Sequence, residues 1–381
     1  RRQRQMCIRD RYKPYDGLSL SVVLKAEGTI EKHVVGSVTE SLVADPVAPE
    51  DYARLTEIFE NPSLQMVTFT ITEKGYSLVN GKGEKLPGVE DGFLAGPGNQ
   101  SHLMGRIASL CYARFVKNGT PLALVSTDNC SHNGDKLKAG VMAYVDAWKQ
   151  AGKVDDDFVS YMEEKVSFPW SMIDKITPRP DEKVKEMLEK DGFEDTDLII
   201  TSRNTYTAPF VNSEETGYLV IEDNFPNGRP PLEKAGIVFT DRETVDKVEK
   251  MKVCTCLNPL HTALAIYGCM LGHTSIHDEM EDKELSQLIQ KMCYEEAMSV
   301  VVNPGVIDPK EFANAVLTKR LPNPFMPDTP QRIACDTSQK LPIRFGETIK
   351  FYENREDLDT KSLTLIPLVL AGWCRHLMGI D

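Results

Sequence analysis

The sequence lacks the features shared by nucleic-acid-binding, membrane-spanning and disulfide-linked proteins. No stripe of lysine and arginine offsets its net charge of −13, so it has no basic footprint for a nucleic acid. Its nine cysteines are an odd number without C-x-x-C spacing, and we interpret them as reduced thiols of a cytoplasmic protein that holds no metal. The apolar stretch from Leu363 to Trp373 contains Pro367 and is too short to cross a bilayer, which predicts a core helix and no membrane partner.

Also absent is G-x-G-x-x-G, the glycine-rich turn that holds the phosphates of a dinucleotide. Gly92, Gly96 and Gly98 lie close together in the sequence, but they have neither this spacing nor a strand before them. The 381 residues therefore offer no recognisable phosphate cradle.

The length of the chain is sufficient for two domains, each with its own core. Its first twelve residues are basic and without pattern, and the segment from Met6 to Asp10 resembles the translation of a sequencing-library adapter. We therefore expect residues 1–12 to be a non-native or disordered tail, with a basic targeting arm as the alternative.

Strands and helices alternate through the next part of the chain. Strand-like runs extend from Leu18 to Ala26, Ile30 to Val38, Val67 to Thr72, Leu122 to Ser126 and Val166 to Phe168, and helical spacing from Asp51 to Phe59, His102 to Val116, Lys136 to Trp148 and Asp181 to Lys190. The first two runs predict a hairpin through Glu27-Gly28. The alternation predicts an α/β domain with a mostly parallel sheet, which Leu198 to Thr201 and Tyr218 to Glu222 would extend.

From about Thr244 onward the pattern is helical. The predicted helices are Thr244 to Cys256, Pro259 to Leu271, Asp282 to Val302 and Pro309 to Leu317. We therefore place a domain boundary near residues 240 to 245, with a sheet domain over 13–243 and a mainly α-helical C-terminal domain over 244–381.

Two places in this layout could carry chemistry. Ligands of open parallel sheets bind beyond the carboxyl ends of the strands, where Glu73 and Asn129 are expected, although Asn129 could simply form a turn. In the helical part, Asn258 before Pro259 predicts a helix N-cap, and Lys252 and His261 would lie close to it at a helix start suited to a developing oxyanion. The alternative is a capping residue beside a solvated lysine.

One pair of histidines superficially suggests a metal. His273 and His277 are four residues apart and lie beside Asp278 and Glu279. The H-E-x-x-H order and a further partner are missing, so we expect no metal site there.

Five stretches, in order, resemble the long-chain, zinc-independent mannitol dehydrogenase family, which includes mannitol 2-dehydrogenases and fructuronate (mannonate) reductases. They are Thr70 to Tyr76, Ser126 to Asn129 with Asn133-Gly134, Phe168 to Pro178, Glu249 to His261, and Arg332 to Pro342. The resemblance implies a Rossmann-like nucleotide-binding domain, a helical C-terminal domain and an active site between them. It also implies an oxidoreductase of carbohydrate metabolism that uses NAD or NADP to interconvert a sugar alcohol or aldonate and its 2-keto or 5-keto form.

The resemblance further implies roles for individual residues. Lys252 would be the general base, Asn129 and Asn258 would hold the reacting oxygen, His261 would orient the substrate, and Glu249 would pass the proton to solvent. The substrate's hydroxyls or carboxylate would meet Arg332 and Lys340, with Asp174 nearby, and the cofactor would meet Thr72, Glu73 and Asn129. This chemistry suits a lysine whose pKa is lowered by burial, and two amides can stabilise an alkoxide without competing for its proton. Arg344 adds a third cation that could recognise a carboxylate, which slightly favours a sugar acid over a neutral polyol.

The sequence departs from the family pattern in three respects. The glycine-rich β-α-β unit that should precede Leu18 is missing, and the chain stops at Asp381, so we expect truncation at both ends. The interval from Lys252 to Asn258 is one residue longer than usual, and we expect the extra residue in the junction before Asn258, with Lys250 as the reserve candidate for the base. The missing turn leaves open a catalytically inactive binding or scaffold protein, and a lysine Schiff-base enzyme is a third hypothesis.

Overall fold

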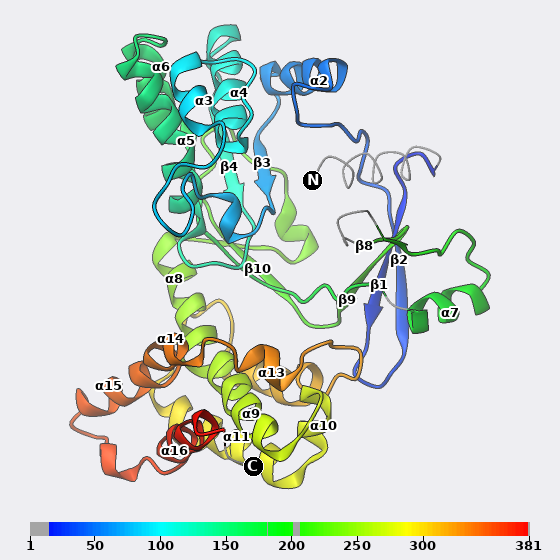
Figure 1. The fold of residues 1–381 in the computed structure, drawn as a ribbon, viewed down its shortest axis with the longest axis vertical. Coiled ribbons are helices and arrows are strands. Elements are labelled where there is room, and N and C mark those ends of the chain that lie inside the picture. The colour runs from blue at the N-terminus through cyan, green and yellow to red at the C-terminus, as the bar shows by residue number, and fades with distance from the viewer. Residues whose placement is uncertain (1–14, 181, 201–205, 380–381) are drawn as a thin grey trace.

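The computed structural model describes residues 15–180, 182–200 and 206–379, so the predicted tail over residues 1–12 lies outside the described part. Within it, the upper half of the molecule is an α/β domain (Figure 1). Its sheet has the order β3-β4-β5, and all pairs are parallel. The strands are β3 (Met66–Phe69), β4 (Leu122–Ser126) and β5 (Val166–Ser167). Every residue of β4 is buried, as expected for the central strand of a covered sheet.

Helices cover this sheet and complete its core. They are α2 (Pro49–Glu60), α3 (Val89–Ala95), α4 (Leu103–Lys117), α5 (Asn133–Gln150) and α6 (Asp156–Glu164). The side chain of Arg114 on α4 is fully buried and donates to five backbone carbonyls, among them Phe59 at the end of α2 and Thr120 before β4. The predicted alternation of strand and helix is confirmed, and with it the parallel sheet.

A second sheet, of order β11-β10-β6, lies beside the first. It contains β6 (Ser171–Asp174), β10 (Tyr218–Glu222) and β11 (Val238–Thr240), and β6 and β10 are antiparallel. The prediction that Tyr218 to Glu222 extends the first sheet is therefore wrong. The reason lies in β5, which is two residues long and is soon followed by Pro169, which has no amide hydrogen for a further partner strand.

The described part of the next predicted run, Leu198–Ile200, does not extend the first sheet either, and Thr201 lies outside the described residues. In the described part its strand, β7 (Ile199–Ile200), pairs only with β8 (Tyr206–Thr207). Helix α7 (Glu182–Lys190) precedes it, close to the predicted helix over 181–190.

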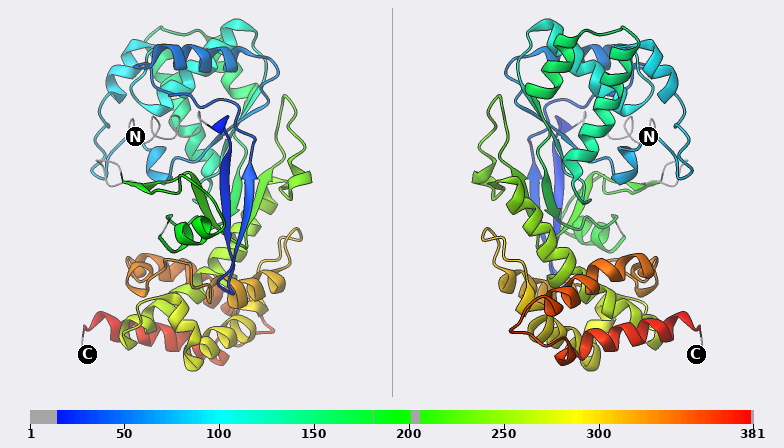
Figure 2. Two further views of the ribbon diagram at one scale, coloured as in Figure 1. Left: turned by 90° about the vertical axis from the view of Figure 1, so that its right-hand side faces the viewer. Right: turned by 90° about the vertical axis from the view of Figure 1, so that its left-hand side faces the viewer.

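The predicted hairpin is confirmed as β1 (Ser19–Leu24) and β2 (Ile30–Val35), which pair antiparallel. An unexpected strand, β9 (Phe210–Glu214), pairs with β1 in parallel on its other side. Figure 2 shows this hairpin reaching from the upper half of the molecule to the helical half. There the buried Asn323 donates to the carbonyl of Leu24 at 3.1 Å, and Met326 packs on the apolar face of β1, so the sheet β2-β1-β9 braces the two halves.

The lower half is helical, as predicted. Helix α8 (Arg242–Lys250) continues through a π-helical segment, Met251–Cys256, and after Leu257 comes α9 (Asn258–Leu271), which is followed by Gly272 in the left-handed conformation. Around α9 lie α10 (Ile276–Glu281), α11 (Lys283–Lys291), α12 (Pro309–Ala315), α13 (Pro330–Ile333), α14 (Thr337–Leu341), α15 (Glu347–Glu353) and α16 (Leu365–Leu377). The change from sheet to helix falls between β11 and α8, and the division into two domains there stays a prediction.

The stretch Arg242–Leu271, 30 residues that are helical except at Leu257, is long and apolar enough to cross a membrane. Of its most apolar window, 61% is buried inside the protein. Leu260, Leu264 and Ile266 belong to the main cluster of the helical half, so α9 is explained as its core helix.

Candidate active site

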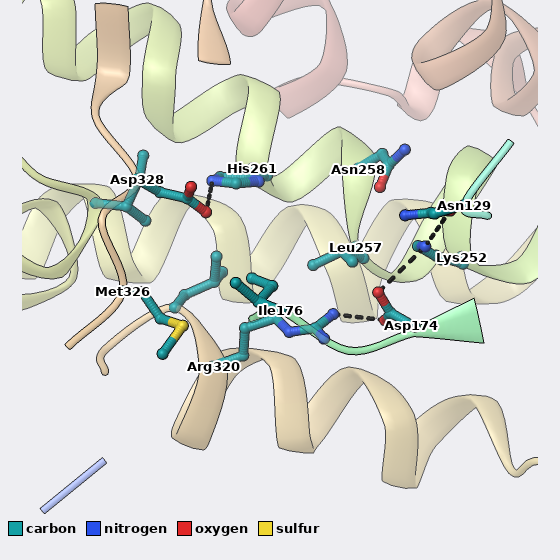
Figure 3. A pocket seen from close by; sticks show the side chains of 12 residues that line it. Asn129, Asp174, Ile176, Lys252, Leu257, Asn258, His261, Arg320, Met326 and Asp328 are labelled. Carbon is teal, nitrogen blue, oxygen red and sulfur yellow. Dashed lines mark hydrogen bonds and ion pairs between the residues drawn. The ribbon is translucent and has the colours of Figure 1, made fainter. Parts of the chain in front are cut away.

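A cavity of about 160 Å³ lies where the strand ends of the α/β half meet the helical half. Its wall brings together five of the residues predicted for the site: Asn129, Asp174, Lys252, Asn258 and His261. The other lining residues are Ile176, Leu257, Ile276, Arg320, Leu321, Met326 and Asp328. Figure 3 shows Lys252, Asn129 and Asn258 at one end and His261 with Asp328 at the other.

Lys252 is held by polar groups from the α/β half. Its side chain is 3% exposed, and its Nζ lies 3.1 Å from Asp174 Oδ1 and donates to Asn129 Oδ1 at 3.1 Å and to the carbonyl of Ile173 at 3.4 Å. Burial lowers the pKa of Lys252 below its ordinary value, and the carboxylate of Asp174 opposes this shift. The ammonium is thus fixed in position in a site that disfavours its charge.

The segment between Lys252 and Asn258 is mostly helical, and the position of the extra residue within it stays a prediction. The helix from α8 onward stays wound through Cys256, with π-helical turns over Met251–Cys256, and only Leu257 separates it from α9. Because a π-helical turn holds about one residue more than an α-helical turn, the segment that carries Lys252 could absorb an added residue.

Asn258 is the first residue of α9 and not its N-cap. The amide of His261 donates to the carbonyl of Leu257 at 3.0 Å, and Leu257 has non-helical backbone angles, so Leu257 is the N-cap and the helix begins one residue earlier than predicted. The side chain of Asn258 has no hydrogen bond to another described residue, and the amide nitrogen of Asn129 has none either. Two amide donors therefore remain available beside Lys252.

His261 and Asp328 form the far end of the cavity. Nε2 of His261 is 3.5 Å from Asp328 Oδ2 but makes no hydrogen bond with a described residue. Burial, and after it the nearby cations led by Arg344, lower the pKa of His261 to about 3. The imidazole is therefore neutral near pH 7 and can either donate or accept a hydrogen bond.

Arg320 and Asp328 were not predicted from the sequence. Arg320 Nη1 lies 2.5 Å from Asp174 Oδ2, and its Nε donates to Glu214 Oε2 at 2.8 Å. Asp174 and Glu214 are 146 and 106 residues away from Arg320 along the chain, so the sequence around Arg320 contains no pattern that predicts these ion pairs. Asp328 lies four residues before Arg332, outside the stretch that carried the family resemblance.

Glu249, Arg332 and Lys340 do not line the cavity. Glu249 lies on α8, three residues before Lys252, and is half-buried. Arg332 is 61% exposed and pairs with Asp328, whereas Lys340 donates to the carbonyls of Ile333, at 3.1 Å, and of Cys335. Two of the three expected substrate-binding residues, Arg332 and Lys340, are thus not among the residues that line the cavity.

Thr72 and Glu73 follow β3 and also lie outside the cavity lining. The buried carboxylate of Asp128 accepts from the amides of Ile71 and Thr72 at 2.8 Å each, which fixes the end of β3 against the end of β4. Thr72 has φ 64° and ψ 155°, an unusual conformation for a β-branched residue. Glu73 forms an ion pair with Lys136 at 2.5 Å. The loop after β3 is therefore held in place by hydrogen bonds to Asp128, and its backbone is strained at Thr72.

In the described chain, one group of side chains could hold a metal ion: His277, Asp278 and Glu281. His273 is not part of it, and Glu279 is buried elsewhere. Nδ1 of His277 is already 2.6 Å from the carbonyl of Pro322. We assign no metal to this surface group, and the absence of a metal site stays a prediction.

Comparison with known proteins gives consistent results over almost the whole chain. The family model for the mannitol dehydrogenase Rossmann domain matches residues 3–234, and that for the mannitol dehydrogenase C-terminal domain matches residues 244–381. D-mannonate oxidoreductase of Thermotoga maritima is 55% identical over 372 residues, which are 97% of this chain and 69% of that protein. Mannitol dehydrogenase 2 of Saccharomyces cerevisiae is 30% identical, over 98% of this chain and 69% of its own length.

Solved structures with the same fold include two related enzymes. D-sorbitol dehydrogenase in substrate-free form has a TM-score of 0.84 at 25% identity, covering 99% of this chain and 72% of that one. Pseudomonas fluorescens mannitol 2-dehydrogenase, in a ternary complex with NAD and D-mannitol, has a TM-score of 0.71 at 26% identity, covering 100% of this chain and 71% of that one.

Proposed function

We propose that this chain, which belongs to the mannitol dehydrogenase family and is an NAD(P)-dependent oxidoreductase of sugar alcohols or aldonates, interconverts an aldonate of the D-mannonate type and its keto form. In this proposal Lys252 is the general base of oxidation and the general acid of reduction. The relative at 55% identity is named for D-mannonate, which supports a sugar acid over a neutral polyol.

The substrate class rests on one observation, a pair of cations without a carboxylate partner. Arg344, which donates to Thr262 Oγ1, and Lys340, which donates to two backbone carbonyls, make no ion pair with a described residue. Burial lowers the pKa of Arg344 to about 10, so its charge is incompletely solvated. Both cations act electrostatically on His261, which lines the cavity. A substrate carboxylate bound near His261 would supply the missing counter-charge.

The reacting carbon is proposed to lie near Lys252. In oxidation, Lys252 takes the proton from the substrate hydroxyl, and in reduction its ammonium returns it. The free amide groups of Asn129 and Asn258 donate hydrogen bonds to the alkoxide, each worth roughly 3 kcal/mol in the transition state. Glu249, on the same helix and half-buried, is the proposed route of the proton to solvent.

NAD(P), when bound, accepts hydride from the alcohol carbon or gives it to the ketone. The end of the parallel sheet fits the carboxamide of a nicotinamide, because hydroxyl and amide groups gather there: Thr70 and Thr127 are 2.8 Å apart, and Asn129 lies two residues after Thr127. Thr72 and Glu73 are proposed to contact the same end of the cofactor. We assign no diphosphate-binding residues, since the G-x-G-x-x-G turn is not in this sequence.

We place the reaction in the cytoplasm, with a small-molecule substrate and with no nucleic-acid or membrane partner. The eight cysteines of the described residues are all free thiols, which supports a reducing compartment. An inactive binding protein is not favoured, because the base, both amides and the imidazole share one cavity.

The test compares D-mannonate with D-mannitol, each with NAD+ and with NADP+, by the ultraviolet absorbance of the reduced nicotinamide. We expect D-mannonate to be the better substrate, and Arg344→Met to raise its KM about tenfold or more, since a charged hydrogen bond contributes roughly 1.5 to 3 kcal/mol. Arg355→Met is the matched control, because that arginine pairs with Asp357 on the exposed surface. Equal oxidation of D-mannitol, or an unchanged KM in Arg344→Met, would contradict the carboxylate assignment.

A further inference from the structure

Arg320 is a buried arginine with two carboxylate partners, directly behind the proposed base. Its side chain is 5% exposed, and those of Asp174 and Glu214 are 6% and 1% exposed. Nη1 contacts Asp174, while Nε and Nη2 both contact Glu214. Arg320 is the last residue of a π-helical segment, Val316–Arg320, and Lys252 also lies in a π-helical segment. The arginine therefore bridges two carboxylates that come from different sheets, β6 and β9.

The two oxygens of Asp174 are divided between two cations. Oδ1 lies 3.1 Å from Lys252 Nζ, and Oδ2 lies 2.5 Å from Arg320 Nη1 (Figure 3). If a buried carboxylate offered both of its oxygens to one ammonium, the ammonium would keep its proton more tightly. Arginine cannot release its own proton in this environment, so it competes with Lys252 for Asp174 at every working pH.

We propose that Arg320 is a positioning residue for the reaction: held in place by Glu214, it withholds one oxygen of Asp174 from Lys252 and thereby lets the lysine give up its proton. This inference rests on the proposed role of Lys252 as the base. Glu214 is the anchor, because its Oε1 also accepts from the amide of Ile176 at 2.5 Å and its Oε2 accepts from Thr216 at 2.8 Å. Arg320 is thus fixed at the cavity wall rather than free to meet substrate.

Charged and titratable groups face Lys252 and its cavity from several packed elements. Those that act on Lys252 are Asp174 on β6, Glu249 on α8 and Arg320 after α12, while Tyr218 on β10 interacts with the same three groups, and His261 on α9 and Asp328 before α13 line the same cavity. Asp174 and Glu249 favour the charged lysine, and Arg320 opposes it. Burial raises the pKa of Tyr218 well above its ordinary value, so its phenol stays neutral.

The proposal predicts opposite effects for two changes. Glu214→Gln removes the negative charge that partly neutralises Arg320, so the guanidinium opposes the charge of Lys252 more strongly and Lys252 should lose its proton at lower pH. The double change Arg320→Met with Glu214→Met leaves Lys252 as the one cation in contact with Asp174 among the described residues, so Lys252 should keep its proton to higher pH. Replacing a buried ion pair by apolar side chains of similar size is often tolerated by the fold, and neither variant leaves Glu214 as an unpaired charge.

The experiment follows Lys252 directly, by NMR titration of the whole chain labelled at lysine Cε, with the signal assigned by its loss in Lys252→Met. We expect shifts of about one pH unit, acidic for Glu214→Gln and alkaline for the double variant. The matched control is Lys319→Met with Glu215→Met, the neighbouring pair at 3.3 Å, which is at least 33% exposed and should leave the titration unchanged. Circular dichroism shows whether each variant is folded.

For D-mannonate oxidation with NAD+, kcat/KM should rise with pH as Lys252 loses its proton. The midpoint of this rise should shift in each variant by the same amount and in the same direction as the NMR titration. Shifts of the same sign in both variants, or no shift in folded protein, would overturn the role of Arg320. Failure to oxidise D-mannonate while the titration shifts as expected would instead reject the substrate assignment and leave this inference standing.

Discussion

Glu279 is a carboxylic acid buried in the helical half without a hydrogen-bond partner among the described residues. It lies on α10 with no exposed surface, and neither of its side-chain oxygens has a partner. The carboxyl group occupies the space beside Gly268 on α9, where a Cβ would overlap it. Burial, with a smaller contribution from Asp278, raises the pKa of Glu279 to about 8.

This raised pKa makes stability depend on pH in a defined direction. In the unfolded chain the carboxyl loses its proton near its ordinary value of 4.5, whereas in the folded protein it keeps the proton up to about pH 8. The folded state therefore binds more protons between these values, and stability falls as pH rises through that window. Each pH unit costs about 1.4 kcal/mol, so from pH 5.5 to 7.5 the loss from this group is about 2.5 kcal/mol.

Glu279→Gln should remove this dependence, because glutamine has nearly the same shape and no charge. We expect its stability relative to the parent protein to rise by about 2.5 kcal/mol between pH 5.5 and 7.5. The measurement is urea unfolding followed by tryptophan fluorescence at pH 5.5, 6.5 and 7.5, read as the difference in unfolding free energy at each pH.

The control is Glu284→Gln on the exposed side of α11, which should show a difference that does not change with pH. A constant difference for Glu279→Gln as well would refute the reasoning, since it would mean that the carboxyl is ionised in the folded protein at all three pH values or that it gains a partner.

Two further predictions concern the site and the scaffold. Lys252→Ala should lower kcat by about 10² to 10⁴ with little change in KM, measured by steady-state oxidation of D-mannonate, whereas Lys250→Ala, which removes an exposed partner of Asp246, should keep near-parental turnover. Arg114→Met should lower the unfolding free energy in urea by about 3 kcal/mol or more, because five backbone carbonyls lose their donor; a loss below about 1 kcal/mol would show that water replaces the guanidinium.

Elements with a strong local pattern could be predicted from the sequence. The apolar run Leu122–Ser126 is strand β4 with the predicted bounds, and the hairpin through Glu27-Gly28 has the predicted partners. In both cases the signal is contained in neighbouring residues: an unbroken apolar run for a buried strand, and two alternating runs around a glycine for the hairpin.

Features that depend on distant partners could not be predicted in this way. Strand β9 pairs with β1 across about half of the chain, and its pattern is mixed because Asn212, Ser213 and Glu214 are buried polar residues. The charge of Glu214 is tolerated inside only because Arg320 meets it there, a fact that neither residue reveals alone. The same reasoning applies to the cavity, whose motif residues were found while Arg320 and Asp328 were not.

The π-helical winding at Met251–Cys256 has a consequence for how this segment can vary in length. In an α-helix each residue advances by about 100° around the axis, so one added residue would rotate everything after it and turn Asn258 and His261 away from Lys252. The wider turn takes up that rotation locally and leaves the angular phase of α9 intact. A difference of one residue in the length of this segment would therefore change the local winding, while the amide and the imidazole would still face the same side of the cavity.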